Sequence, residues 1–405
     1  MKHLVLFLIS VAVLAAQTPV TAPAVVLKPA RVFDGEVLRE NWDVVVRGER
    51  IEAAGPAAEV RAPEGSKVIE LPGATLLPGL IEAHSHVLLH PYNETTWNDQ
   101  VAREPLALRV ARATNHLRAT LLAGFTTIRD LGTEGAGYAD AGLKQAVEQN
   151  IIPGPRMIVA TRAIVATGTY GPRGFVPEWT VPQGAEEASG VDELIRVTRD
   201  QISRGADVVK VYADYRWGAR REAAPTFSIE ELKAIVETAR SSHRGVVAHA
   251  ATAEGMRRAT LAGVETIEHG YEGTAETFKL MKEHGVALVP TLSVGPRDAA
   301  RKAMFKAALD SGVTIVSGSD VGVFPHGTEA LELQMMVEYG MAPAAALSAA
   351  TAISAGVLHM EREIGRVQPG LFADLIAVAG DPTKEIGALR NPTFVMKGGV
   401  VVKAP

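Results

Sequence analysis

The pattern of apolar and polar positions divides the chain into two kinds of segment. Near each end, apolar residues alternate with polar ones between Gly, Pro and Asp, as in "DVVVRGERIEAAG" and "PTFVMKGGVVVKAP". This alternation is typical of half-buried β-strands joined by short turns. We therefore expect β-hairpins at both ends of the chain.

The middle of the chain alternates between short apolar segments and amphipathic helices such as "VDELIRVTRDQISRG". Alternating strands and helices need crossover connections and therefore predict a parallel sheet. Eight such units favour a (β/α)₈ barrel over residues 78–361. An open doubly wound sheet is the alternative, but no glycine-rich phosphate loop supports it. The expected strands are residues 80–86, 125–130, 156–164, 207–214, 246–250, 265–270, 286–291 and 314–320.

The first residues, "MKHLVLFLISVAVLAAQTPVTAPA", resemble an export signal. Lys2 precedes an apolar run from Leu4 to Ala16, which is too short for a comfortable membrane span and is followed by small residues. We expect residues 1–22 to be a signal peptide that is removed, which makes the mature protein periplasmic or secreted. A buried N-terminal strand or an uncleaved anchor is the alternative.

Composition narrows the classes of partner. The chain of 405 residues contains no cysteine, which excludes a disulfide framework and a lipid-attached cysteine. Its 41 basic and 46 acidic residues are spread along the chain and give a net charge of −5, so we expect no nucleic-acid partner. After signal cleavage we expect no membrane contact. The oligomeric state, a homo-oligomer included, is left open.

Candidate metal ligands stand at the carboxyl ends of four expected strands, where barrel active sites are built. Each has an ordinary explanation alone, because a single histidine packs in many cores and a terminal aspartate often caps a helix. Together, four imidazoles and a carboxylate suit zinc or a similar divalent ion. They are His84, His86, His249, His269 and Asp320.

Lys210 lies inside the apolar strand "DVVKVYAD", on the same face as Tyr212. A buried ammonium group is costly and cannot ligate a cation. Carboxylation by CO₂ would convert it into an anionic carbamate that can bridge two metal ions. An ion pair with a neighbour such as Asp320 is the alternative, and both remain open at this point.

The order H-x-H, Lys, His, His, Asp, together with "LLPGLIEAHSHVLL" and "GRVQPGLFADLIAV", resembles the amidohydrolase superfamily. Within it, the chain is similar to the imidazolonepropionase-like and prolidase-like branch. The resemblance implies a barrel plus a small β-sandwich domain formed by residues 23–77 and 362–405. It also implies two divalent ions, of which one binds His84 and His86 and the other binds His249 and His269. Carboxylated Lys210 would bridge them, and Asp320 would bind metal and act as the general base.

The implied activity is hydrolysis of a small-molecule amide by a hydroxide held between the ions. Secreted members of this branch include dipeptidases, acyl-amino-acid hydrolases and mycotoxin-degrading amidases. A cyclic amide or ester hydrolase with the same centre is one alternative, and a non-catalytic periplasmic metal- or ligand-binding protein is another. No cysteine and no G-x-S-x-G motif offers a competing nucleophile.

Loops after the expected strands supply candidates for substrate contacts. Related proteins often carry T-G-G-H-G after the third strand, whereas this chain has "ATGTYG", so Tyr170 or Tyr212 is expected to polarise the scissile carbonyl. Arg173 and His326 are candidates to bind a substrate carboxylate, although exposed loop charge is the ordinary interpretation. The segment "YADYRWGARREAAPTF" is either a lid over the pocket or a solvated loop.

Overall fold

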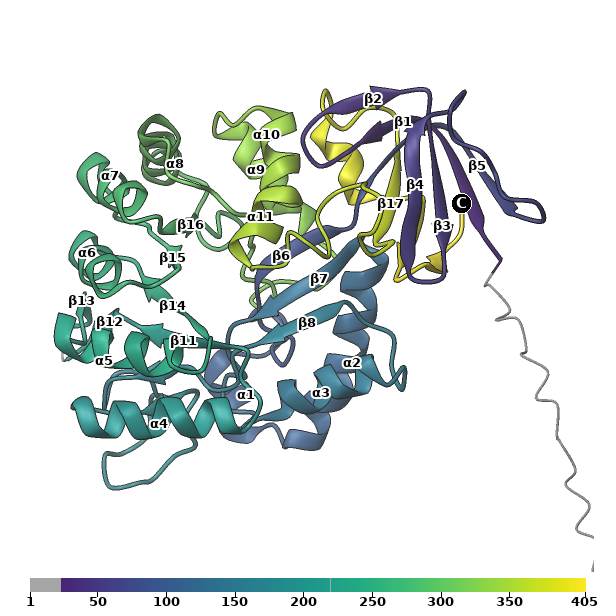
Figure 1. The fold of residues 1–405 in the computed structure, drawn as a ribbon. Coiled ribbons are helices and arrows are strands. Elements are labelled where there is room, and N and C mark those ends of the chain that lie inside the picture. The colour runs from purple at the N-terminus through teal and green to yellow at the C-terminus, as the bar shows by residue number, and fades with distance from the viewer. Residues whose placement is uncertain (1–22, 219) are drawn as a thin grey trace, which may run out of the picture.

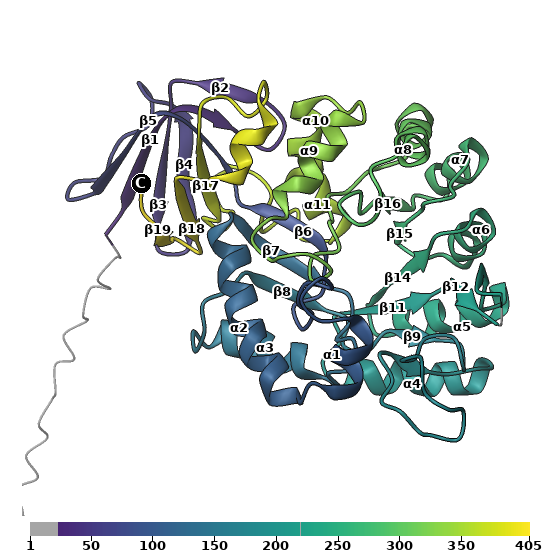
Figure 2. The same ribbon diagram turned by 180° about the vertical axis from the view of Figure 1, so that it is seen from behind.

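The structure is a computed structural model that describes residues 23–218 and 220–405. It is an α/β protein in which parallel strands, covered by helices, adjoin a sheet built from both ends of the chain (Figures 1 and 2). The expected signal segment, residues 1–22, lies outside the described residues. No helix in the described part is long and apolar enough to cross a membrane.

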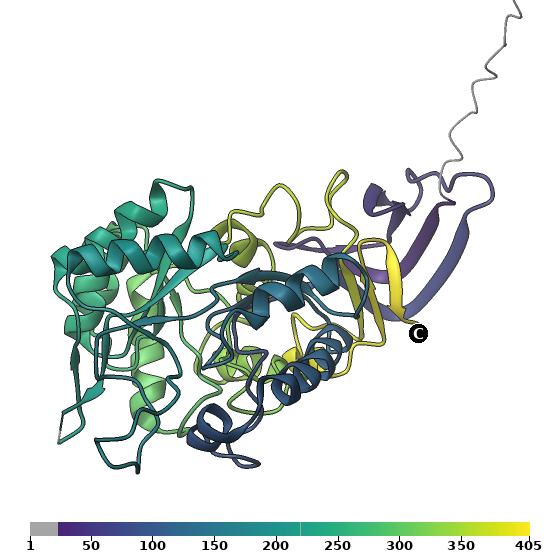
Figure 3. The same ribbon diagram turned by 90° about the horizontal axis from the view of Figure 1, so that it is seen from below.

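The strands near the two ends of the chain form one mixed sheet of eight strands, in the order β19-β18-β17-β5-β1-β3-β4, with β2 paired to β1. Strand β5 is central, because it pairs in parallel with β1 and antiparallel with β17. Figure 3 shows this sheet at one end of the molecule. Its strands are β1 (Val25–Phe33), β2 (Leu38–Glu40), β3 (Trp42–Arg47), β4 (Arg50–Pro56), β5 (Lys67–Pro78), β17 (Leu375–Ala379), β18 (Phe394–Lys397) and β19 (Val400–Lys403).

The middle of the chain forms two runs of parallel strands, β6-β7-β8 and β10-β9-β11-β14-β15-β16. The register places residues at the carboxyl ends of neighbouring strands side by side, as in the pairs Tyr212 with His249 and Ala250 with His269. Polar side chains at these ends therefore gather at one edge. The strands are β6 (Leu80–Ser85), β7 (Phe125–Asp130), β8 (Arg156–Val159), β9 (Ile164–Val165), β10 (Glu186–Glu187), β11 (Val208–Tyr212), β14 (Gly245–Ala250), β15 (Thr266–His269) and β16 (Ala287–Val289).

Two of the expected strands differ from the prediction. Residues 156–164 are split into β8 and β9 because Thr161 adopts a φ of 61°, which ends the extended run. Residues 314–320 form no regular strand: Ile315 makes only an isolated bridge to Leu288, and Asp320 at the end of the segment has a φ of 63°. This segment still lies between β16 and β6, because the Val316 amide donates to Leu288 and the Ala83 amide donates to Ser317.

Helices cover the outer side of the parallel strands (Figures 1 and 2). Their starts are set locally: Ser228 and Glu231 form a capping box at the start of α5, and the Thr252 side chain caps α6. The helices are α1 (Trp97–Arg103), α2 (Leu106–Leu122), α3 (Ala139–Glu148), α4 (Val191–Ser203), α5 (Ile229–Arg240), α6 (Ala253–Ala262), α7 (Ala275–Glu283), α8 (Ala299–Ser311), α9 (Ala330–Glu338), α10 (Pro343–Ala349), α11 (Ala352–Val357) and the 3₁₀ helix η1 (Ile386–Arg390).

The hydrophobic core of this region joins the outward-facing strand residues to the helices. Val209 and Val211 of β11 belong to one buried cluster with Leu232 and Ile235 of α5. Alternate residues of the same strand, Lys210 among them, are therefore directed to the other face of the strand. This alternation places polar groups on the face of the parallel strands that is turned away from the helices.

Candidate active site

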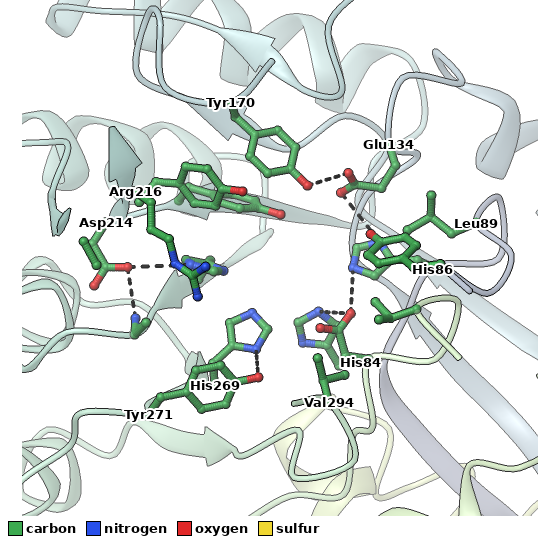
Figure 4. Close-up of a pocket in the computed structure, with 18 residues that line it drawn as sticks. His84, His86, Leu89, Glu134, Tyr170, Asp214, Arg216, His269, Tyr271 and Val294 are labelled. Atoms are coloured by element: carbon green, nitrogen blue, oxygen red, sulfur yellow. Dashed lines mark hydrogen bonds and ion pairs between the residues drawn. The ribbon is translucent and has the colours of Figure 1, made fainter. Parts of the chain in front are cut away.

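A cavity of about 380 Å³ opens at the carboxyl ends of the parallel strands (Figure 4). It brings together the four expected histidines, Asp320, Tyr170 and Tyr212. The lining residues are His84, His86, Leu89, Tyr92, Glu134, Tyr170, Tyr212, Asp214, Tyr215, Arg216, Ala223, His249, Ala251, His269, Tyr271, Val294, Asp320 and Val323.

His84, His86 and Asp320 form the most compact group of potential metal ligands. One ligand atom from each of the three lies within 4.8 Å of the others. The Oδ1 atom of Asp320 is 3.6 Å from Nε2 of His84 and 3.3 Å from Nε2 of His86. Imidazole nitrogens and a carboxylate at this spacing are able to hold a divalent ion.

His249 and His269 extend this group toward β14 and β15. The ring centroids of His84 and His269 are 5.1 Å apart, and those of His249 and His269 are 4.5 Å apart. Burial lowers the pKa of His84 to about 4, and burial lowers the pKa of His249 and of His269 well below its usual value. These three rings are therefore uncharged at neutral pH, which is the form that ligates a metal.

His86 and Asp320 are coupled as an ion pair. Burial lowers the pKa of His86, but the hydrogen bond and charge of Asp320 outweigh burial and raise this pKa to about 9. Burial raises the pKa of Asp320, but His84 and His86 outweigh burial and hold this pKa below its usual value. The carboxylate of Asp320 is thus ionised and aimed at the two imidazoles.

A second layer of contacts orients three of the imidazoles. Nδ1 of His84 lies 2.7 Å from Glu268, Nδ1 of His86 lies 2.9 Å from the carbonyl oxygen of Gly132, and Nδ1 of His269 lies 2.9 Å from the Thr291 hydroxyl. Contacts of this kind fix the ring and leave Nε2 for a ligand. His249 differs, because its Nε2 atom lies 3.7 Å from Asp214.

Lys210 on β11 has a buried Nζ atom with no hydrogen-bond partner among the described residues. Nζ lies 5.7 Å from the centre of the Tyr212 ring, and within the described part of the chain no carboxylate pairs with it. Burial lowers the pKa of Lys210 to about 8. Buried nitrogen atoms in protein cores usually have hydrogen-bond partners, so the unpartnered Nζ atom near the histidines is unusual. Its environment fits a side chain that is covalently modified.

The two tyrosines have different partners. The Tyr170 hydroxyl donates to Oε2 of Glu134 at 2.6 Å, and the Trp97 indole donates to the same oxygen at 2.7 Å. Tyr212 stacks on His249 with ring centroids 4.4 Å apart, and its hydroxyl interacts with that of Tyr170, but no carboxylate of the described residues is hydrogen-bonded to it. The proton of Tyr170 is therefore committed to the Glu134 carboxylate, whereas the Tyr212 hydroxyl has only the Tyr170 hydroxyl as a neighbour and lines the cavity.

Neither Arg173 nor His326, the two expected carboxylate-binding residues, lines this cavity. Arg173 lines a neighbouring cavity of about 430 Å³, which shares only Arg216 with the first. His326 is stacked on His116 with ring centroids 4.4 Å apart, and its Nε2 atom faces the carbonyl oxygen of Leu89 at 3.3 Å. Packing thus holds the His326 ring beneath the loop that follows β6, away from the ligand space.

Several lining or supporting residues were not expected from the sequence, notably Glu134, Arg216 and Glu268. Glu268 precedes His269 on β15, and strand alternation alone could have placed it on the opposite face. Glu134 lies in a loop and Arg216 in a short hairpin, and no local pattern predicts how either is placed relative to the cavity. Arg216 belongs to the segment considered as a lid, which forms the hairpin β12 (Asp214–Trp217) and β13 (Glu222–Pro225) and borders the cavity.

Three lining residues have a left-handed backbone conformation, which residues other than glycine rarely adopt. The φ angles are 49° for Glu134, 77° for His269 and 63° for Asp320. Each such residue costs on the order of 1–3 kcal/mol of stability, and such strain is concentrated at functional sites. The surrounding packing therefore holds these three side chains in the cavity although their backbone conformations are unfavourable.

Comparison with known proteins gives a consistent picture. The chain is 31% identical to ochratoxinase of Aspergillus niger, over 92% of this chain and 85% of that protein. It is 25% identical to imidazolonepropionase of Symbiobacterium thermophilum, over 87% and 86% of the two chains. A crystal structure of a Xaa-Pro dipeptidase with bound methionine superposes with a TM-score of 0.84 at 28% identity, covering 94% of this chain and 100% of that one.

The model of the amidohydrolase family matches residues 75–403, which include every strand that carries a candidate ligand. The H-x-H pair, the later histidines and the strand-end aspartate meet in one cavity, as that resemblance implied. This chain belongs to the amidohydrolase family.

Proposed function

We propose that the protein is a binuclear metal-dependent hydrolase that cleaves the amide bond of dipeptides or N-acyl amino acids. Family membership supports a metal-dependent amide hydrolase. The observation that carries the proposal is the meeting of four histidines and Asp320 around one cavity, with the unpartnered Nζ of Lys210 buried near His84 and His249. The similarity to ochratoxinase and to a Xaa-Pro dipeptidase supports an amino acid as the leaving group.

The donor set fits two divalent ions, of which zinc suits the histidine-rich ligands best. His84 and His86 would hold one ion and His249 and His269 the other, with Asp320 as an additional ligand. The three uncharged imidazoles and the ionised Asp320 are already in the protonation states that ligation requires.

Lys210 would join the two ions as a carbamate. Its ammonium group would first release one proton, and the resulting amine would attack CO₂, forming an N–C bond and releasing a second proton to solvent, which leaves an anion in place of the original cation. The absence of any partner for Nζ in the described residues supports this role, because an ammonium there would repel the bound cations. The carboxylated residue would offer one oxygen to each ion.

The ions, when bound, supply Lewis acidity toward the scissile carbonyl and make water nucleophilic at neutral pH. Asp320 accepts the proton of the attacking water and passes it to the leaving amine. The Tyr212 hydroxyl donates to the developing oxyanion, since no carboxylate in the described part of the cavity is hydrogen-bonded to it. The buried walls exclude bulk water from the reacting groups.

We further propose that the parallel strands close into a (β/α)₈ barrel and that the sheet from both chain ends is the small β-sandwich domain. The hydrogen bonds from Asp207 to Val159 and from Ala83 to Ser317 support closure, because they join the separate runs of strands. Barrel closure would hold all the ligand-bearing strand ends in one ring.

The proposed function is tested by a screen of aminoacyl and N-acyl amino acids, with and without a chelator, combined with metal analysis. We expect about two divalent ions per chain and amide hydrolysis that is lost with the metal. Ester or cyclic-amide hydrolysis without amide hydrolysis would favour the alternative substrate class. Tight metal binding without turnover of any of these substrates would favour a non-catalytic binding protein.

Lys210→Ala tests the bridge directly. We expect the variant to lose both metal and activity, because two facing cations would lack the anion between them. Added acetate or propionate is expected to restore part of both by entering the vacated space. Retention of both ions and of near-normal turnover would identify Lys210 as a structural residue.

A further inference from the structure

Beyond the expected metal ligands, Glu134 lies at one end of the cavity, and Arg216 lies at the other end together with Asp214, whose carboxylate accepts hydrogen bonds from Ala251 and Thr252. Glu134 lies beside His86, whereas Arg216 lies on the other side of the cavity beside Asp214 (Figure 4). Arg216 is the only Lys or Arg among the described residues that line this space. The scissile bond proposed above would lie between these two side chains, at the histidine cluster.

The carboxylate of Glu134 is bound only by uncharged side-chain donors. Its Oε2 atom accepts from Tyr170 and from Trp97. Its Oε1 atom accepts no hydrogen bond in the described part of the structure and lies 3.9 Å from Nδ1 of His86, which faces Gly132 instead. The nearby guanidinium of Arg109 is bonded to backbone carbonyl oxygens, including that of Glu134 itself.

The Glu134 carboxylate is 2% exposed, and its ion-pair contact with Nδ1 of His86, at 3.9 Å, is too long for a hydrogen bond, so its charge is costly to bury. Glu134 also has a left-handed backbone conformation. Two features of this residue therefore cost stability: its buried charge and its backbone conformation. An ammonium group of a ligand would relieve the first of them by a charge-assisted hydrogen bond. The free Oε1 atom is the acceptor that remains for it.

Arg216 offers the complementary charge. Its guanidinium makes no hydrogen bond or ion pair with any described residue, and its backbone is fixed by the β12–β13 pairing opposite Ala223. The neighbouring cavity, which shares Arg216, is also lined by Arg173 and Arg221 and has Glu187 as its one described carboxylate. A guanidinium fork in this setting matches a carboxylate.

We propose that Glu134 binds the α-ammonium group and Arg216 the α-carboxylate of a zwitterionic dipeptide. This inference rests on the proposed amide hydrolysis and narrows its substrate class from dipeptides or N-acyl amino acids to dipeptides with both termini free. Glu134 and Arg216 are thus specificity-determining residues. The aromatic side chains of Tyr170, Tyr212 and Tyr215 lie in contact with one another along the wall between the two ends.

A glycyl and a propionyl derivative of the same amino acid test the role of Glu134. The two acyl groups have the same size and differ only in an ammonium against a methyl group. We expect wild-type kcat/KM to favour the glycyl compound about 10- to 100-fold. Glu134→Gln keeps acceptors for Tyr170 and Trp97 but removes the charge, and it is expected to bring the ratio close to one.

A free dipeptide and its C-terminal amide test the role of Arg216 in the same way. We expect wild type to favour the free carboxylate about 10- to 100-fold, Arg216→Ala to lose this preference and Arg216→Lys to keep part of it. Arg220→Ala is the matched control, because Arg220 lies on the same hairpin, is exposed and lines neither cavity. An unchanged ratio in Arg216→Ala would overturn the assignment of Arg216.

Binding provides a readout that is independent of turnover. Aminomethyl and ethyl phosphonamidate analogues of the two substrates would be titrated calorimetrically into the metal-loaded protein. Tighter binding of the aminomethyl compound by wild type, lost in Glu134→Gln, is the expected result. Equal affinities would overturn the inference even if amides are hydrolysed, whereas normal binding preference without hydrolysis would contradict only the proposed function. If Glu134→Gln fails to fold, the wild-type preference alone decides.

Discussion

At the scale of single residues, the existing hydrogen bonds and ion pairs determine which side chains can still bind a substrate. Tyr170 stands where related proteins often have a histidine, yet its hydroxyl donates to Glu134. Tyr212 has the same chemistry, but among the described residues its hydroxyl interacts with the Tyr170 hydroxyl and with no carboxylate. Two tyrosines that the sequence cannot rank are thus distinguished by one hydrogen bond.

Tyr212→Phe is expected to lower kcat by about 10²–10³ because it removes a donor to the developing oxyanion. Tyr170→Phe should have a smaller effect on kcat, since its proton serves Glu134. Steady-state kinetics of the two variants on the same amide measure the difference. A larger loss of kcat in Tyr170→Phe would reverse the assignment.

At the scale of elements, the site depends on the close approach of residues 314–320 to β6. A Cβ atom placed on Gly318 would lie 2.4 Å from Cγ1 of Val289 and 2.9 Å from the backbone nitrogen of His84. Only glycine lets the two segments approach this closely. The position of His84 therefore depends on a residue that carries no side chain.

Gly318→Ala is expected to destabilise the protein by about 1–3 kcal/mol and to weaken metal retention, because the added methyl group must displace His84. Gly142→Ala is the matched control: its Cβ would meet nothing within 4 Å on an exposed position of α3. That variant should be about 0.5–1 kcal/mol more stable. Denaturant unfolding and metal analysis measure both, and equal behaviour of the two variants would contradict the prediction.

Glu332 of helix α9 holds the loop after β16 by hydrogen bonds and so contributes to the position of the site. Its carboxyl oxygens accept from the backbone amides of Leu292 and Ser293, in the loop after β16, at 2.8 and 2.7 Å. The same loop contains Thr291, which contacts His269. Burial raises the pKa of Glu332 from 4.5 to about 7.

Because the folded-state pKa of Glu332 is above its unfolded value, its contribution to stability is fully present below pH 4.5 and is lost as the pH rises through about 7. We expect wild type to lose on the order of 3 kcal/mol relative to Glu332→Gln between these limits. Denaturant unfolding of both proteins at pH 5 and pH 8 measures this loss. A constant difference between them would show that Glu332 does not titrate in this range.

At the scale of the whole molecule, the sequence predicted those features of the fold that follow from regular patterns of apolar and polar residues. The strand ends that carry His84, His249 and His269 followed from alternating hydrophobicity, and their convergence followed from parallel connections. The sequence did not predict the non-extended backbone at Asp320 or the packing of His326, because both arise from contacts between distant segments. Glu134 and Arg216 were missed for the same reason: a loop places Glu134 and an inserted hairpin places Arg216, and neither placement has a short-range signature.

We propose export of the protein, with the mature chain beginning near residues 17–23. The first described strand, β1, begins at Val25, so cleavage there would remove none of the contacts described above. Mass spectrometry of the protein recovered from outside the cytoplasm measures the mature N-terminus. An intact Met1 in that material would contradict the proposal.

The pairing of β5 with β17 has a consequence for the timing of folding. Strand β5 leads directly into β6, which carries His84, but its partner β17 begins only at Leu375. Nearly the whole chain must therefore be synthesised before the first strands find their last neighbours. Contacts between residues so distant in sequence form slowly, which would keep a nascent chain open long enough to be threaded through a membrane before it folds.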